Sequence, residues 1–97
     1  MNYTISPKVA WQIVPGNDFV YIFNSDTNEY LQLDDIAAEI WIMICKNTDY
    51  GEIINTISSK YEEKKENVIL DINQFFKEMV FQGILDTYEI NKLDKIK

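Results

Sequence analysis

The apolar residues of this chain change their spacing once, close to residue 34, and that change limits the folds open to it. Before it, short apolar runs are separated by polar turns; after it, apolar residues recur every third or fourth position. The first pattern is typical of β-strands and the second of amphipathic helices. With 97 residues, the chain has room for one domain. The sequence therefore predicts a single α+β domain whose strands come first.

Three segments before the change have the composition of strands, namely residues 9–14, 19–23 and 29–33. They are rich in β-branched and aromatic side chains. In the third segment, Leu31 and Leu33 share one face, with Tyr30 and Gln32 on the other. The connections contain Pro, Gly, Asn and Asp, which favour tight turns. Because short turns join neighbouring strands, we expect a three-stranded antiparallel sheet with the wholly apolar second segment in its centre.

Three helices are predicted after the sheet. Their apolar stripes are Ile36, Ala37, Ile40, Trp41 and Ile44; Ile53, Ile54, Ile57 and Tyr61; and Val68, Ile72, Phe75, Phe76 and Met79. Asp34 or Asp35 is placed to cap the first helix, and Asp49 with Glu52 resembles a capping box before the second.

The last predicted helix spans about residues 65–82, and Gly83 follows it where a left-handed residue often ends a helix. Ile84 and Leu85 can then pack back on the core. Beyond them the chain is rich in lysine, with scattered apolar residues. We therefore expect a folded unit over residues 1–86 and a frayed tail over residues 87–97.

Absences in the composition argue against catalysis. The chain has no histidine, so it has no imidazole base and no histidine metal ligand. Its one cysteine, Cys45, lies in an apolar run and is expected to be a buried, inert thiol. The carboxylates are scattered over polar faces, and the three glycines form no phosphate-binding loop. We expect no enzyme activity, no metal and no cofactor.

The charge balance argues against nucleic acid. Sixteen acidic residues oppose nine basic ones, all of them lysine, for a net charge of -7. Such a chain is repelled by phosphate backbones and lacks arginine, the better donor to guanine. The first residues lack the features of a secretory signal, and the longest apolar run, residues 40–45, is too short to span a membrane. With a lone cysteine, these features predict a cytoplasmic protein without a membrane partner.

An exposed sheet edge beside a helix could bind an extended peptide. The edge would be the strand Glu29–Leu33, and the facing wall would be the third helix. Phe76 and Ile72 are expected in the core. The position of Phe75 around the helix axis allows it to lie either in the core or in the groove. Asp71 could lie in the groove or be an ordinary solvated residue.

Two blocks of residues, with a shorter segment before them, resemble the PqqD family. The first is Asn28–Trp41, with its turn residue, aromatic, closing leucine, polar cap and Ile-Trp pair. The second is Asp71–Met79 followed by Gly83–Leu85. Pro7–Trp11 is also similar. The resemblance spans roughly residues 7 to 85, nearly all of the part expected to fold, and the two blocks at their observed separation are what make it specific.

The resemblance implies a winged helix-turn-helix-like fold, the RiPP recognition element. Such domains bind the leader segment of a ribosomally made precursor peptide as an added strand, between the third strand and the third helix. They present it to a radical SAM enzyme, a cyclodehydratase or a lasso-type leader protease. Carried onto this chain, the peptide-binding residues would be Glu29, Tyr30, Leu31, Gln32, Leu33, Asp71, Gln74, Phe75 and Glu78. Asn28 replaces a usual glycine, and Phe76 and Met79 replace leucines, so the shape of the groove or core is in question.

Two other functions stay open. A winged-helix DNA-binding protein would share the topology, although the third helix carries Asp71 and Glu78 with Lys77 as the nearby basic residue. A structural dimerisation module could use Leu70 and Phe81, which lie outside the apolar stripe. A homodimer would also be compatible with leader binding.

Overall fold

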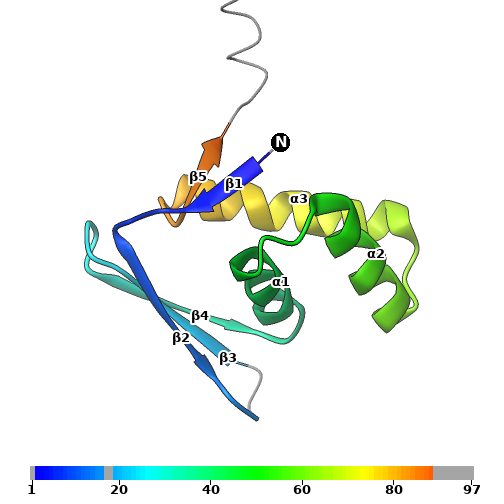
Figure 1. Ribbon diagram of the computed structural model, residues 1–97, viewed down its shortest axis with the longest axis horizontal. Coiled ribbons are helices and arrows are strands. Elements are labelled where there is room, and N and C mark those ends of the chain that lie inside the picture. Colours follow the sequence, from blue (N-terminus) through cyan, green and yellow to red (C-terminus); the bar gives the residue numbers. More distant parts are fainter. Residues whose placement is uncertain (1, 17–18, 89–97) are drawn as a thin grey trace, which may run out of the picture.

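The computed structural model describes residues 2–16 and 19–88 and contains two small antiparallel sheets and three helices (Figure 1). The elements are β1 (Asn2–Ile5), β2 (Val9–Val14), β3 (Phe19–Asn24), β4 (Glu29–Asp34), α1 (Asp35–Cys45), α2 (Tyr50–Tyr61), α3 (Lys65–Phe81) and β5 (Leu85–Tyr88). The predicted α+β arrangement, a three-stranded antiparallel sheet followed by three helices, is confirmed by β2 to α3.

The larger sheet has the order β2-β3-β4, with β3 in the centre as predicted. Val20 pairs with Leu33, and Ile22 pairs with Leu31. Because opposite residues share a face, these side chains form the inner layer of the sheet. The turn into β4 contains Asn28, whose φ of 63° is left-handed. Asparagine adopts this conformation more readily than most residues, which explains how it replaces a glycine there.

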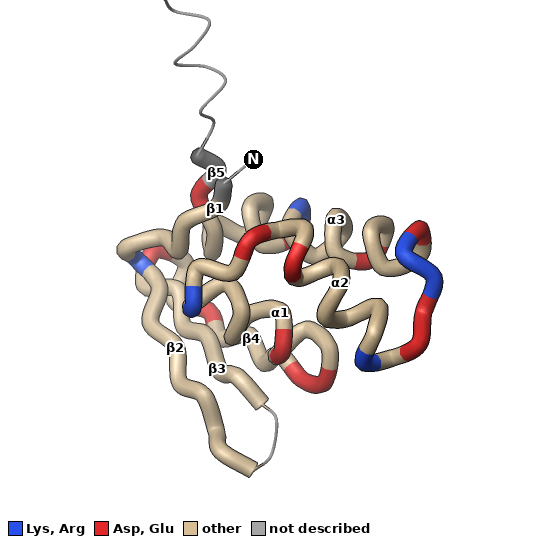
Figure 2. Tube along the Cα trace, turned by 45° about the vertical axis from the view of Figure 1, so that its right-hand side comes forward, with Lys and Arg blue, Asp and Glu red and all other residues tan. Residues whose placement is uncertain are grey.

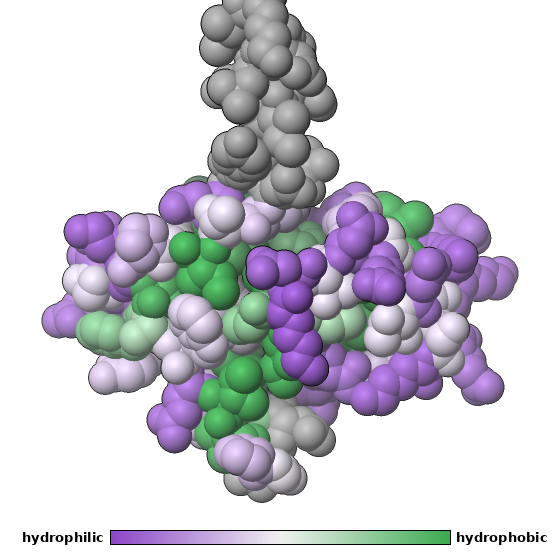
Figure 3. All heavy atoms as spheres, viewed as in Figure 1, coloured by the Kyte–Doolittle hydropathy of each residue, from purple (hydrophilic) through white to green (hydrophobic). Residues whose placement is uncertain are grey.

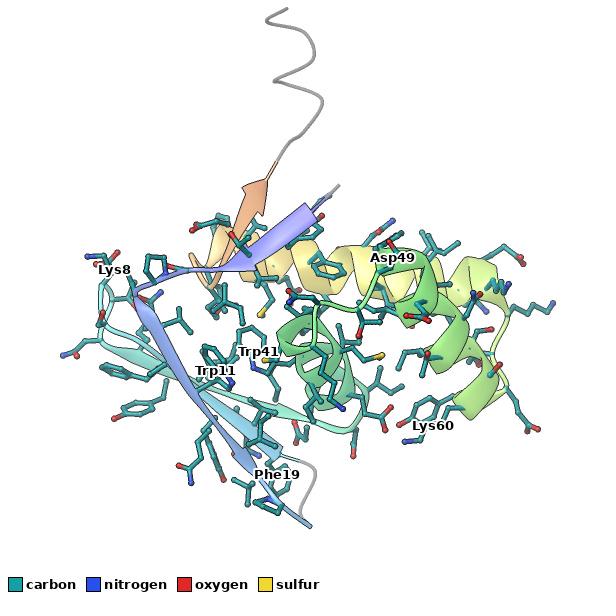
Figure 4. All side chains as sticks on the ribbon, viewed as in Figure 1. Lys8, Trp11, Phe19, Trp41, Asp49 and Lys60 are labelled. Carbon is teal, nitrogen blue, oxygen red and sulfur yellow. The ribbon has the colours of Figure 1, made fainter. Side chains whose placement is uncertain are left out.

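Helix α1 lies against the inner face of this sheet, α2 packs on α1, and α3 packs on α2, so that the core forms between the sheet and the helices (Figure 1). Trp41 of α1 is fully buried, together with Val20 and Ile22 of β3 and Ile72 of α3. Trp11 points from β2 towards Trp41 (Figure 4), and the two rings meet edge to face with centroids 5.7 Å apart. The sheet and α1 are therefore joined by apolar burial and by a favourable aromatic contact.

The helix starts follow the predicted positions, but one predicted cap is wrong in its chemistry. The Asp49 carboxylate accepts a hydrogen bond from the Gly51 amide at 3.1 Å, as an N-cap should. Asp34 occupies the N-cap position of α1 without a capping hydrogen bond from its side chain. Asp35 follows with a φ of 53°, so the chain turns from β4 into α1 through a left-handed residue.

The end of α3 follows the predicted pattern closely. Gly83 has a φ of 74°. Its amide donates to the Val80 carbonyl at 3.0 Å, and the Ile84 amide donates to the Met79 carbonyl at 2.9 Å. This pair of bonds is the Schellman motif, and Ile84 is buried behind it. The motif turns the chain sharply from α3 into β5.

A second sheet, of β1 and β5, was not predicted from the sequence. Asn2 pairs with Tyr88 and Ile5 with Leu85, so the two ends of the described chain lie side by side. Each strand has only four residues, too few for a periodic signal, and their partners are far apart in sequence. Thr87 and Tyr88 of the predicted tail belong to β5, while residues 89–97 lie outside the described part.

Three further side chains bear on expectations from the sequence. Cys45 is half-buried rather than fully buried, and burial raises the pKa of its thiol. Leu70 and Phe81 are exposed, at 69% and 90% of their surface. The surface apolar residues predicted on α3 are therefore open to solvent.

The Schellman motif gives a stability prediction. Gly83→Ala should lower the free energy of unfolding by about 1–2 kcal/mol, because a Cβ is disfavoured at this left-handed φ. A steric clash adds little, since the nearest atom to an added Cβ would be Asn24 Nδ2 at 3.6 Å. Urea denaturation followed by circular dichroism measures the change. Ser59→Ala, at an exposed site in α2, should stay within about 0.5 kcal/mol. Equal midpoints for Gly83→Ala and wild type would contradict this account.

Candidate functional site

Strand β4 forms one edge of the larger sheet. Among the described residues it pairs with β3 on one side, and no strand pairs with the other side. Backbone amide and carbonyl groups on that side are therefore available for hydrogen bonding. An open edge of this kind is a template for a further strand.

The five predicted residues of β4 divide between two faces. Leu31 and Leu33 face inwards, and Leu33 is buried in the core while Leu31 is half-buried. Glu29 shares their face but is exposed. Tyr30 and Gln32 are exposed on the outer face. A ligand at this edge could therefore reach Leu33 through its backbone but not through its side chain.

The predicted residues of α3 also gather along one flank. Asp71, Phe75 and Glu78 recur at the spacing that aligns helical residues, and Gln82 extends the row by one more turn. Phe75 is half-buried, and Asp71 and Glu78 are exposed. Gln74 is exposed beside them and donates to the Glu78 carboxylate at 3.0 Å. Three of the four predicted residues of α3 thus share this flank, and Gln74 lies at its outer border.

The β4 edge and the α3 flank approach each other at one end, where a small hollow of about 60 Å³ lies between them. Glu29, Tyr30 and Leu31 line it from the start of β4. Gln82 and Ile84 line it from the end of α3. In Figure 1 this is the left-hand side, where β4 begins below the last turn of α3.

Asn24 fastens the two walls together at this hollow. It is a buried polar residue, and its Nδ2 donates to the Gln82 carbonyl at 3.2 Å. Its Oδ1 accepts from the Asp26 amide at 2.9 Å, which closes the turn before β4. The side chain therefore holds the β3–β4 turn against the end of α3, and a buried amide with both ends bonded fixes that contact.

Neither Asn24 nor Gln82 was among the predicted site residues. Gln82 could have been found by extending the row Asp71, Phe75 and Glu78 by four residues. Asn24 carries no such signal, because an asparagine after an apolar strand is usual for a solvated turn. Its burial arises from the contact with α3, which is distant in sequence.

Phe75, which the sequence left open between core and groove, packs partly into the core. The ring meets the buried Phe76 ring edge to face, with centroids 5.9 Å apart. It packs against the core yet remains partly exposed on the groove flank. One part of the ring is thus anchored while the other is open to a ligand.

The charges around this site are acidic. Glu29 lies on β4, and Asp71 and Glu78 lie on the facing flank of α3. Lys77 projects away from that flank, because neighbouring helical residues are rotated by about 100°. Figure 2 shows β2 and β3 without charged residues along their described length. The site would therefore favour cationic over anionic ligands.

Two further classes of site are absent from the part of the chain that the structure describes. No group of three or more His, Cys, Asp or Glu side chains is close enough there to hold a metal ion. No helix in that part has the length and apolar character needed to cross a bilayer.

Comparison with known proteins gives one family and one fold. The profile of the family "Coenzyme PQQ synthesis protein D (PqqD)" matches residues 20–85. No curated protein matches the chain significantly.

Two solved structures superpose closely on this chain. One is TbiB1 in complex with the TbiA(beta) leader peptide, with a TM-score of 0.81 and 24% identity over 92% of this chain and 99% of that one. The other is a lasso peptide synthetase B1 complexed with the leader peptide, with a TM-score of 0.80 and 17% identity over 90% of this chain and 100% of that one. At these identities the two likenesses establish a shared fold.

The role of Asn24 can be tested by its removal. Asn24→Ala should lower the free energy of unfolding by about 1–3 kcal/mol, because it leaves the Gln82 carbonyl and the Asp26 amide without their partner. Thr27→Ala is the matched control, since Thr27 lines the same hollow but is exposed. Chemical denaturation should separate the two variants. Similar losses in both would show that Asn24 does not fasten the turn to α3.

Proposed function

Because the chain belongs to the PqqD family, we propose that it is a recognition domain that binds the leader segment of a ribosomally made precursor peptide. The leader adds to β4 as a further strand and lies in the groove between β4 and α3. The observation that carries the proposal is the unpaired edge of β4 beside a helix flank, with Asn24 holding the two together. In such a complex, the main-chain hydrogen bonds provide affinity and the side-chain contacts provide specificity.

The contacts assign different roles to the two walls. The β4 backbone supplies the paired groups, and the exposed part of Phe75 supplies an apolar anchor. Asp71 and Glu78 attract basic residues of the leader, since no basic side chain lies on their flank. The structural similarity to two proteins that were solved with leader peptides supports the proposal that this chain binds a leader.

The partner enzyme follows from the same proposal. A domain that binds the leader by strand addition leaves the rest of the precursor free to reach a second protein. We infer that this second protein is a modifying enzyme or a leader protease, and that the domain itself acts as the binding subunit. The half-buried Cys45 and the scattered carboxylates are given no catalytic role.

The contribution of Phe75 to leader binding is testable with the fluorescein-labelled leader of a candidate precursor peptide. Phe75→Ala should raise its Kd about thirtyfold, which corresponds to a loss of about 2 kcal/mol at an apolar anchor. Asp71→Ala should raise the Kd less, and its effect should shrink with added salt, because the contact is exposed. Fluorescence anisotropy gives these values.

Phe81→Ala is the matched control, because Phe81 lies on the same helix and is 90% exposed, but is rotated about 90° around the helix axis from the row Asp71, Phe75 and Glu78. It should bind the leader as wild type does. Circular dichroism of each variant confirms that it is folded. A wild-type chain that binds no leader from neighbouring precursor genes would refute the proposal.

The DNA-binding alternative makes an opposite prediction. If α3 were a recognition helix, duplex DNA should bind tightly at low salt and lose affinity as salt rises. With Glu66, Asp71 and Glu78 on α3 against Lys65 and Lys77, we expect no shift of a duplex in a native gel at about 50 mM salt. A shift at sub-micromolar protein would reverse the ranking of the two functions.

The dimerisation alternative has one specific observation in its favour, the outward exposure of Leu70 and Phe81. A module with that role alone would be dimeric by light scattering and would not respond to the leader. Phe81→Ala would then dissociate it, so the control variant above also separates these functions.

A further inference from the structure

The sheet has an outer face, turned away from the helices, that carries aromatic side chains. Phe23 and Tyr30 are opposite each other across β3 and β4, and Ala10 is opposite Phe23 on β2. Tyr21 and Gln12 form the next pair on this face. Together these residues surround an open hollow of about 260 Å³. No described helix covers them.

Phe23 and Tyr30 form the start of a ladder of aromatic rings. Their ring centroids are 4.8 Å apart with the planes tilted by 45°, a favourable cross-strand contact. Phe23 is half-buried in the central strand, whereas Tyr30, in the edge strand, is 79% exposed. The exposed aromatic surface is therefore concentrated at the edge where a further strand would be added.

Strand addition at β4 has a geometric consequence for this ladder. Side chains of any added strand alternate between the two faces of the sheet, whether it runs parallel or antiparallel to β4. One side chain must lie directly beside Tyr30 on the outer face. Its neighbours along the peptide then point to the inner side, where Phe75 and Asp71 form the flank of α3.

We propose that Tyr30 is a specificity-determining residue, which binds an apolar and preferably aromatic side chain of the added peptide on the outer face of the sheet. The inference rests on the proposed function and extends it. Side chains of the leader would contact the protein on both faces of the sheet rather than in the groove alone. The peptide residue beside Tyr30 becomes the third member of the row that Phe23 and Tyr30 begin.

The chemistry of the outer face supports this occupant over a charged one. No charged side chain lies on β2 or β3 (Figure 2), and on the outer face of β4 the charged residue is Asp34, four residues along the strand from Tyr30. Figure 3 shows hydrophobic residues over the lower end of β2, whereas hydrophilic residues cover most of the α2–α3 side. A second copy of the chain or a modifying enzyme could also meet an apolar face. The continuity of Tyr30 with the edge of β4 favours the peptide.

Tyr30→Ala and Tyr30→Phe test the proposal with the labelled leader described above. Tyr30→Ala should raise the Kd about three- to fivefold, the effect expected of one cross-strand aromatic pair. Tyr30→Phe should bind as wild type, because the ring is retained. Gln12→Ala is the matched control, since Gln12 is exposed on the same face of the sheet but lies on β2, the strand farthest from the open edge of β4. It should change the Kd by less than about twofold.

An alanine scan of the leader identifies the residue that Tyr30 contacts. Alanine at one outward-facing position of the leader should weaken its binding to the wild-type protein. The same substitution should cause no further loss of affinity for the Tyr30→Ala variant, which is the signature of a direct contact. Alanine substitutions at the adjacent leader positions should instead be non-additive with Phe75→Ala. Unchanged affinity in Tyr30→Ala, or coupling at no peptide position, overturns the proposal while leaving leader binding intact.

Light scattering tests whether a second copy of the chain, rather than the leader, covers the outer face. A wild-type dimer that dissociates in Tyr30→Ala, with the Kd for the leader unchanged, would assign the outer face to a second copy and overturn the proposal. A wild-type chain that binds no leader at all overturns both the proposal and the function on which it rests. Because Tyr30 is exposed, its variants are expected to remain folded.

Discussion

The hydrogen bond from Asn24 to the Gln82 carbonyl is the contact on which the geometry of the groove depends. It joins the β3–β4 turn to the last turn of α3, two segments that the fold brings together from opposite halves of the sequence. Without it, β4 and α3 would be connected mainly through the core between them. Because the Asn24 side chain is buried, water does not readily replace its partners, and the edge of β4 stays at a fixed distance from the flank of α3.

Most of the fold could be predicted because its signals are local. The spacing of apolar residues located β2, β3, β4 and all three helices, and Gly83 located the end of α3. The failures have a common physical origin. Strands β1 and β5 pair across almost the whole chain, and the burial of Asn24 depends on α3. Asp34 has the composition of a cap, but the left-handed Asp35 after it changes the direction of the chain, and no capping hydrogen bond forms from its side chain.

Part of the candidate site was also predictable from local sequence signals. The resemblance to the family selected Asp71, Phe75 and Glu78, and helical phase explains why they share one flank. Strand alternation separated Tyr30 and Gln32 from Leu31 and Leu33. Neither pattern gives the distance between β4 and α3. The hollow and its lining by Gln82 and Ile84 follow from the Schellman turn, which brings the chain back under the end of the helix. The outer aromatic face needed the cross-strand register as well as the alternation.

Pairing of Asn2 with Tyr88 has a mechanical consequence. Force applied between the two ends of the described chain would act on β1 and β5 from their shared open end. The rungs of an antiparallel pair loaded in this way separate one after another, rather than shearing together. The pair would peel back from Asn2 towards Ile5, and Tyr3 would leave the face of Phe76, on which its ring is stacked. Extension would therefore begin at this small sheet, before the force acts on β2 and α3.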